Sequence, residues 1–282
     1  MIKDYYYLTK PGIIYGNLLT TVAGFLLASR FPIRLSLFLG TVVGSSLIMA
    51  SACVVNNCLD IEIDKKMERT KIRALAIGKI SKLAAITFAL ILFFLGCLVL
   101  ILFVNLLVLL IGLYAFFAYV VVYGYAKRRS VYGTLVGSLS GAAPIVGGYC
   151  AVTGTINLSA LLLYLVMITW QMPHFYAIAI RRSKDYKNAG LPVWPNIKGV
   201  ESAKKQIVFF IVLFIDANLM LSLFGPTKVI YALILTTLGL YWLRLALKKQ
   251  KDNLVWARQL FLYSLVVVLI MSVSLSFGAI LA

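Results

Sequence analysis

The sequence predicts an all-α, polytopic membrane protein with nine transmembrane helices, and its composition and apolar runs predict this fold. Of the 282 residues, 62% are hydrophobic and only 13% are charged, whereas soluble domains average about 45–50% apolar and about 25% charged residues. The apolar residues form unbroken runs of about 20, the length that an α-helix needs to cross the hydrocarbon core. A transmembrane β-barrel would instead show alternating segments of about ten residues. A soluble enzyme, a disordered chain and a barrel are therefore excluded.

The apolar runs predict where the nine helices lie. We place them at about 11–29, 36–58, 82–102, 104–123, 131–151, 157–180, 206–224, 227–246 and 260–281. The third and fourth are nearly continuous, because Asn105 is the only break between them and no charged residue is near. The division between these two helices therefore needs independent support.

The basic residues provide that support. With nine spans, 24 of the 27 Lys and Arg residues fall on one side of the membrane, and only Arg30, Arg34 and Lys228 fall on the other. Basic loops stay on the cytoplasmic side, so the N-terminus is predicted to be cytoplasmic. Fusing the third and fourth helices would move the later basic loops to the wrong side. The net charge of +18 thus reflects membrane orientation, and no nucleic acid partner is expected.

The cysteines and the N-terminal segment indicate the compartment. Cys53, Cys58, Cys97 and Cys150 lie in or beside apolar runs without CxxC spacing, which predicts neither a disulfide framework nor a zinc site. The segment 1–12 has a tyrosine cluster and Lys10-Pro11 before the first apolar run, unlike a cleaved signal or a transit peptide. We expect a multi-pass protein of a bacterial inner membrane.

Two cytoplasmic loops are long and charged, at about 59–81 and 181–205, and four helices separate them. This spacing predicts a single integral-membrane domain over residues 1–282, built from two four-helix halves and a ninth helix. Long loops in compact proteins are commonly functional, and these carry most of the acidic residues. We expect the chemistry at the cytoplasmic face.

The end of the second span carries an acidic motif. If the helix continues through it, Asn56, Asn57, Asp60 and Asp64 project from one face. Their oxygens suit Mg²⁺, which takes one or two protein carboxylates and completes its shell with water and phosphate oxygens. Alternatively, the motif is only the polar end of a helix entering water. Two carboxylates on one face repel each other unless a cation lies between them, which favours the metal site.

Cationic residues surround this motif and a second one. The segment 65–73 is basic and suits a polyanion, although contact with anionic lipid is the alternative for part of it. Near the end of the sixth span, Asp185 lies among four cations, and Ala189 occupies the position of a possible second carboxylate. Two such motifs could hold one diphosphate through bridging Mg²⁺. A diphosphate held beside an apolar cavity suggests prenyl transfer.

These motifs resemble the UbiA superfamily of intramembrane prenyltransferases, whose first motif is NDxxDxxxD. The haem branch of that superfamily has Asn-Asn at the start, as Asn56-Asn57 do here, and Ala189 also agrees with that branch. The similarity extends over nearly the whole chain, through Thr9–Gly12 with Asn17, Asn56–Leu75, Lys127–Gly154, Trp170–His174 and Asp185–Pro195.

The resemblance implies a reaction and a site. Farnesyl diphosphate and haem b would be the substrates, and Mg²⁺ the cofactor. The farnesyl group would be added to a vinyl group of the haem, with water supplying a hydroxyl. Membrane lipid surrounds such an enzyme, and a terminal oxidase or the haem A synthase machinery would be its partner. The implied catalytic residues are Asn57, Asp60, Asp64 and Asp185, with Asn56 added for the metal. The implied diphosphate-binding residues are Lys10, Asn17, Arg69, Lys71, Arg128, Arg182, Lys184 and Tyr186.

Three further features are less specific. His174 is the only histidine and lies with Trp170 in the haem-branch motif, so we interpret both as haem contacts, with a packing role as the alternative. Gly133, Gly137 and Gly141 repeat every four residues, which indicates close helix packing more than space for a porphyrin. Asp216 is an acidic residue within the seventh span, and we assign it no role.

Three other functions fit the sequence less well. A prenyltransferase acting on 4-hydroxybenzoate or another quinone precursor fits the first motif but not Asn56-Asn57, Ala189 or the Trp170–His174 segment. A transporter would place its acidic residues near the bilayer midplane, whereas here they lie at helix ends. A haem-binding assembly factor would not need the Asp and Asn cluster.

Overall fold

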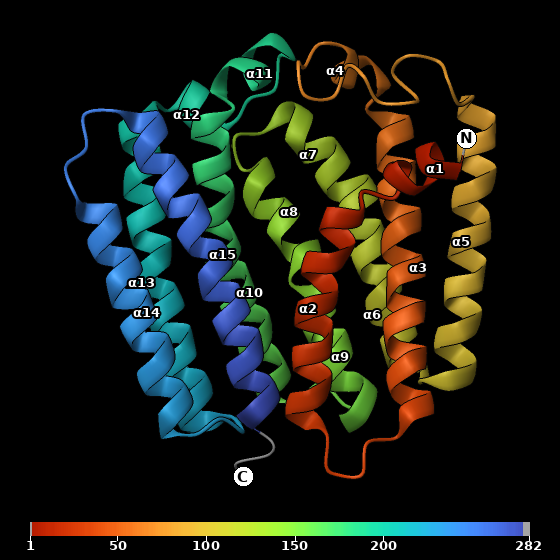
Figure 1. Ribbon diagram of the computed structural model, residues 1–282, viewed down its shortest axis with the longest axis vertical. Helices are drawn as coiled ribbons and strands as arrows, with labels where there is room; N and C mark the ends of the chain where they lie inside the picture. The colour runs from red at the N-terminus through yellow and green to blue at the C-terminus, as the bar shows by residue number, and fades with distance from the viewer. Residues whose placement is uncertain (1, 279–282) are drawn as a thin grey trace.

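The computed structural model describes residues 2–278, and every regular element in that range is a helix. The helices stand roughly parallel in one bundle (Figure 1). They are α1 (Ile2–Leu8), α2 (Pro11–Ala28), α3 (Leu35–Leu59), α4 (Ile61–Lys65), α5 (Lys82–Phe103), α6 (Leu106–Phe117), the π-helix η1 (Ala118–Tyr123), α7 (Gly124–Arg129), α8 (Gly133–Gly141), α9 (Ala143–Thr153), α10 (Leu158–Arg181), α11 (Ser183–Asn188), α12 (Trp194–Ile197), α13 (Val200–Phe224), α14 (Val229–Leu247) and α15 (Asn253–Gly278).

The prediction of nine spans is confirmed for residues 2–278. Nine helical segments are long and apolar enough to cross a membrane. The fourth comprises α6, η1 and α7, and the fifth comprises α8 and α9. Two predicted starts are too late, because α13 begins at Val200 and α15 at Asn253. The apolar run marks only the part in hydrocarbon, while the helix continues into polar residues whose backbone hydrogen bonds are satisfied within it.

Asn105 separates the third and fourth spans as the charge pattern required. Its Oδ1 accepts a hydrogen bond from the Val108 backbone N–H at 2.9 Å and so caps α6. Its Nδ2 donates to the carbonyl oxygens of Cys150 and Ala151, at 3.2 and 3.3 Å. One side chain therefore begins α6 and also satisfies the last turn of α9.

The spans enclose a central space. Helix α15 packs against α10, α14 and α2, so the last span closes the bundle against the first. Helices α5, α13 and α14 stand at the periphery. The short helices α4, α11 and α12 lie together at one end of the bundle (top of Figure 1), where both long loops were predicted.

Glycines allow the closest helix contacts. A Cβ atom added to Gly24 of α2 would overlap the carbonyl oxygen of Ile145 in α9, and one added to Gly148 would overlap that of Thr21. A glycine at each position lets the two backbones touch, as is common between membrane helices.

The glycine repeat in α8 also has a packing role. A Cβ at Gly133 would lie 2.8 Å from Lys127 Cα, and one at Gly137 would lie 2.9 Å from the Tyr123 ring. A Cβ at Gly141 would overlap Gln171 Oε1. The predicted packing role of these three glycines is thus confirmed, and all three also line the central cavity.

Gly148→Ala should destabilise the protein, because the Cβ meets backbone atoms of α2 that cannot move independently. We expect a loss of about 1–3 kcal/mol, measured by thermal unfolding in detergent. Gly147→Ala is the matched control, since its Cβ meets only Ile111 Cγ2 at 3.8 Å. Equal stability of the two variants would show that the contact between α2 and α9 is not tight.

Candidate functional site

A cavity of about 470 Å³ lies inside the bundle. Its lining comes from α2, α3, α6, η1, α7, α8, α9, α10, α11 and α15 and the adjoining loops, and within residues 2–278 none of it comes from α5, α13 or α14. Four residues predicted as site residues line it: Asn17, Trp170, His174 and Tyr186.

One end of the cavity is polar. Tyr119, Tyr123 and Lys127 follow one another on η1 and α7 and all line it. The Tyr119 and Tyr123 rings stack with centroids 5.6 Å apart, and Lys127 Nζ lies 5.2 Å from the centre of the Tyr123 ring. A π-helical turn is wider than an α-helical one and is frequent at functional sites. Here it lies directly beside the cavity.

The first acidic motif is not one continuous helix. Helix α3 ends at Leu59, Asp60 adopts a non-helical conformation, and α4 begins at Ile61. The Asp60 N–H still donates to the Asn56 carbonyl at 3.0 Å, and the Asp64 N–H donates to the Asp60 carbonyl at 2.7 Å. The break therefore preserves the turn-by-turn spacing, and both carboxylates are buried.

Two cations from the fourth span bind the Asp60 carboxylate. Lys127 Nζ donates to its Oδ2, and Arg128 Nη2 donates to its Oδ1 at 2.9 Å. Arg128 Nη2 also donates to the Leu59 carbonyl at 2.7 Å. Since Lys127 lines the cavity, it connects the buried carboxylate to that space.

Asp64 has its own cation. Arg73 Nη1 lies 2.9 and 2.8 Å from the two carboxylate oxygens of Asp64 and 3.2 Å from Asn57 Oδ1. Asn57 Nδ2 donates to the Leu8 carbonyl at 2.9 Å. Both ends of the Asn57 amide are therefore engaged, and Arg73 joins the loop to the end of α3.

Lys10 completes this polar cluster from the start of α2. Its Nζ donates to Asn56 Oδ1 at 2.8 Å, and burial lowers the pKa of Lys10 to about 8. Asn56 Nδ2 is buried and has no hydrogen-bond partner within residues 2–278. An unused buried donor of this kind is available to an oxyanion.

The second motif lies at the mouth of the cavity. Asp185 is on α11, with Arg182 Nη1 4.0 Å from its Oδ2. Tyr186 lines the cavity. Burial raises the pKa of Tyr186, partly offset by the positive charge of Arg69. The interaction of Arg69 with Tyr186 shows that the two predicted loops meet here.

Some predicted residues stand apart from the cluster. Lys71 forms an exposed ion pair with Glu68, with Nζ–Oε2 2.6 Å, and Lys184 is exposed. Within the described range, no three Asp, Glu, His or Cys residues lie close enough to hold a metal. Asp185 thus does not join Asp60 and Asp64 in one preformed cluster. Asp216 is exposed on α13, away from the cavity lining.

The far end of the cavity is apolar and aromatic, with Met167, Trp170, Leu265 and Val268 in its lining. His174 also lines the cavity, and its ring stacks on Trp170 with centroids 5.0 Å apart.

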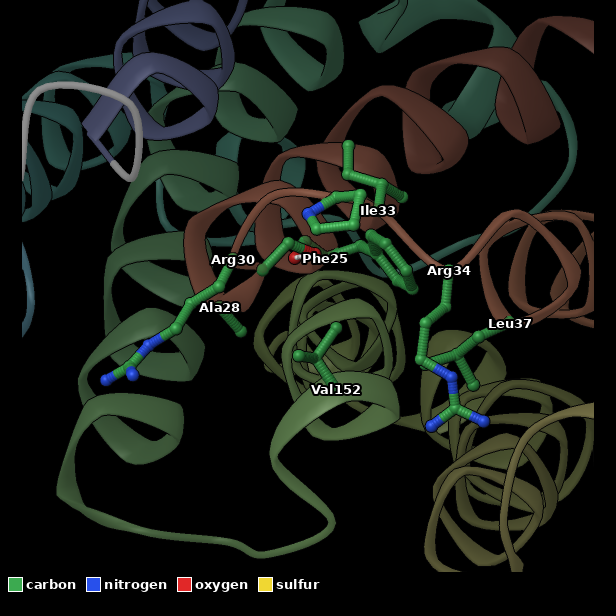
Figure 2. A pocket seen from close by; sticks show the side chains of 9 residues that line it. Phe25, Ala28, Arg30, Ile33, Arg34, Leu37 and Val152 are labelled. Carbon is green, nitrogen blue, oxygen red and sulfur yellow. Dashed lines mark hydrogen bonds between the residues drawn. The ribbon is translucent and has the colours of Figure 1, made fainter.

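A second cavity, of about 350 Å³, lies at the connection between α2 and α3. Figure 2 shows that the side chains of Arg30 and Arg34 extend away from each other. The Ser29 hydroxyl donates to the Phe25 carbonyl at 2.8 Å. No polar groups converge in this described lining, so the larger cavity is the candidate active site.

Arg73 and Lys127 are site residues that the sequence patterns did not predict. Lys127 begins the run Lys127-Arg128-Arg129 at the end of a span, and Arg73 lies nine residues after Asp64. A rule that buried carboxylates need cations would have raised both as candidates. Sequence spacing alone could not select Arg73 from a segment with five basic residues.

The arrangement of these residues can bind a metal and a polyanion beside an apolar chain. Two buried carboxylates can hold a divalent cation with phosphate oxygens, and Lys127, Arg128 and Arg73 can neutralise a polyanion. The adjoining cavity can hold an apolar chain away from water. These properties suit binding of a diphosphate with an apolar substituent.

Solved structures share this fold. A structure of digeranylgeranylglyceryl phosphate synthase aligns with a TM-score of 0.81 at 21% identity, covering 100% of this chain and 99% of the other. A UbiA homologue from Archaeoglobus fulgidus bound to GPP and Mg²⁺ aligns with a TM-score of 0.73 at 15% identity, covering 99% and 100%.

Sequence relatives are more similar. Proteins named protoheme IX farnesyltransferase from Edwardsiella ictaluri (strain 93-146) and Enterobacter sp. (strain 638) are 48% identical over 279 residues. The alignments cover 98% of this chain and 94% and 95% of those proteins. The model of the UbiA prenyltransferase family matches residues 17–265. The chain therefore belongs to the UbiA prenyltransferase family, and within it to the protoheme IX farnesyltransferases.

Proposed function

We propose that this protein transfers the farnesyl group of farnesyl diphosphate to a vinyl group of haem b, forming haem O and releasing diphosphate. The observation that carries the proposal is the contact between Lys127 and Asp60. It connects a buried carboxylate and its cations to a cavity whose other end presents His174 and Trp170. The likeness to proteins named protoheme IX farnesyltransferase supports the identity of both substrates.

The donor set fits Mg²⁺ held together with substrate. Asp60 and Asp64 are buried hard-oxygen ligands, and Mg²⁺ commonly binds through one or two carboxylates and substrate phosphates, without an all-protein cage. Within residues 2–278, no three Asp, Glu, His or Cys residues form a group that could hold a metal without substrate. This agrees with a metal that binds partly through substrate phosphates. We assign Asp60 and Asp64 as ligands, with Asn56, Asn57 and Asp185 beside the diphosphate. Bound Mg²⁺ would neutralise charge on the leaving diphosphate.

The cations of the site bind the leaving group. Lys127, Arg128 and Arg73 neutralise the carboxylates while the site is free, and they turn toward the diphosphate oxygens when substrate binds. Lys10, Asn17, Arg69 and Tyr186 lie around the same end and add donors. Lys71, Arg182 and Lys184 are more exposed and have a part in attracting the anion.

The reaction breaks the C1–O bond of farnesyl diphosphate, the vinyl π-bond of haem b and one O–H bond of water, and it forms one C–C bond and one C–O bond. The C1–O bond of farnesyl diphosphate breaks, and diphosphate leaves with the electron pair. The vinyl π-electrons of haem b form the new C–C bond, which leaves a cation on the carbon next to the porphyrin. Water adds there and loses a proton, giving the hydroxyl group. Tyr119 and Tyr123 line the cavity, and their aromatic rings would help to stabilise the allylic cation.

The proposal includes the setting of the enzyme. We place it as a single domain with its N-terminus and active site at the cytoplasmic face of a bacterial inner membrane, because the basic residues gather there. The product would pass within the membrane to haem A synthase or to a terminal oxidase.

Asp60→Asn should lower kcat/KM by about 10²- to 10³-fold, because it removes one charge that holds the metal and its diphosphate. Purified protein in detergent would be incubated with farnesyl diphosphate, Mg²⁺ and either haem b or 4-hydroxybenzoate, and the products analysed by mass spectrometry. Glu62→Gln is the control, because Glu62 is exposed and pairs only with Lys65. Prenylated 4-hydroxybenzoate in place of a modified haem would assign a quinone precursor as the acceptor.

Metal and diphosphate should bind together. Alone, Mn²⁺ must displace Lys127, Arg128 and Arg73 from the carboxylates, whereas with diphosphate these cations gain a new partner. We expect inorganic diphosphate to raise Mn²⁺ affinity by about 5- to 150-fold, measured by electron paramagnetic resonance. Lys127→Met should reduce this coupling, and Lys65→Met should leave it unchanged. Equal Mn²⁺ affinity with and without diphosphate would show that these cations do not move from the carboxylates to the diphosphate.

A further inference from the structure

The hydrogen bonds around His174 fix its tautomer. His174 Nδ1 lies 2.7 Å from Ser264 Oγ, and Ser264 Oγ lies 2.6 Å from the Phe261 carbonyl oxygen. A carbonyl oxygen only accepts, so the single hydroxyl proton of Ser264 goes to Phe261. Ser264 Oγ must therefore accept from His174, which places the ring proton on Nδ1 and the lone pair on Nε2.

The imidazole is also held in one orientation. The Trp170 ring stacks on it at an interplanar angle of 25°, and Phe261 packs against it with centroids 5.0 Å apart. The Trp170 indole N–H donates to the Ser264 carbonyl at 2.9 Å. The imidazole is thus held by one hydrogen bond of its own and two aromatic contacts, and the hydrogen bond from Trp170 to Ser264 ties α10 to α15 beside it.

His174 Nε2 is left available. It makes no hydrogen bond within residues 2–278, although His174 lines the cavity. A histidine that serves only packing would be expected to have both nitrogens satisfied. One nitrogen donating to a fixed acceptor while the other stays free is the usual arrangement of a metal-ligating histidine.

We propose that His174, held by Ser264 as the Nδ1–H tautomer, coordinates the iron of haem b through Nε2. This inference rests on haem b being the acceptor substrate. Nε2 donates its lone pair to the iron, and no proton or electron is exchanged. Ser264 acts as a positioning residue, because its contact with the iron is only through His174.

The first experiment compares two porphyrins. Wild-type protein and His174→Ala would be titrated with haem b and with iron-free protoporphyrin IX. We expect His174→Ala to weaken haem b binding at least tenfold and to remove the histidine-ligated absorption spectrum, with iron-free porphyrin affinity unchanged. Added imidazole should restore the ligated spectrum in His174→Ala, which also shows that the variant is folded.

The second experiment tests Ser264. Ser264→Ala should weaken haem b binding by about 10- to 100-fold, because the Nδ1–H loses its acceptor, while iron-free porphyrin binding stays the same. Ser272→Ala is the matched control, since Ser272 is buried on the same helix and its Oγ has no partner within residues 2–278. We expect no change in haem affinity for this control.

Specific outcomes would overturn the inference. An unchanged haem spectrum in His174→Ala would exclude axial ligation while leaving farnesyl transfer to haem intact. Equal losses for haem b and iron-free porphyrin would assign His174 to packing against the macrocycle. If the wild-type protein binds farnesyl diphosphate but not haem b, then haem b is not the acceptor substrate and His174 does not ligate its iron.

Discussion

The structure depends on how two buried carboxylates are neutralised at the edge of the membrane. Burying an unpaired charge is costly, so Asp60 requires Lys127 and Arg128, and Asp64 requires Arg73. The contacts of Asp60 join the end of α3 to α7, which is far away in sequence, and the contact of Asp64 joins α4 to the loop that follows α4. The same contacts define the polar end of the cavity, so the folding constraint and the binding site share one set of side chains.

This constraint also explains how a charged substrate can enter an apolar bundle. In the proposed site, a diphosphate with a divalent cation would replace the internal ion pairs by an equivalent set, in which the cations bind phosphate and the carboxylates bind metal. Little net charge would then be created in a poorly solvated place. The apolar part of the proposed substrate would lie along the cavity, which would keep water away from an allylic cation.

The shape of the cavity results from local departures from regular helix. The π-helix η1 lies beside the cavity and presents Tyr119 and Tyr123 to it, and the glycines of α2 and α9 bring those helices into backbone contact. The α2–α9 contact is therefore tight, whereas the cavity lies beside η1. At the apolar end, α10 and α15 fix one imidazole through Ser264 and Trp170. A rigid wall and a polar mouth suit a reaction that must align two large substrates.

By itself, the sequence determined the class, the nine spans and the location of the acidic motif, because apolar length and charge asymmetry are local properties. It also identified Asp60, Asp64 and His174 as residues of interest. Only the tertiary structure selected Arg73 and Lys127 as the partners of the two carboxylates, and Ser264 as the partner of His174. Such pairings join residues on different helices, and their choice depends on helix rotation and depth, which no linear spacing encodes.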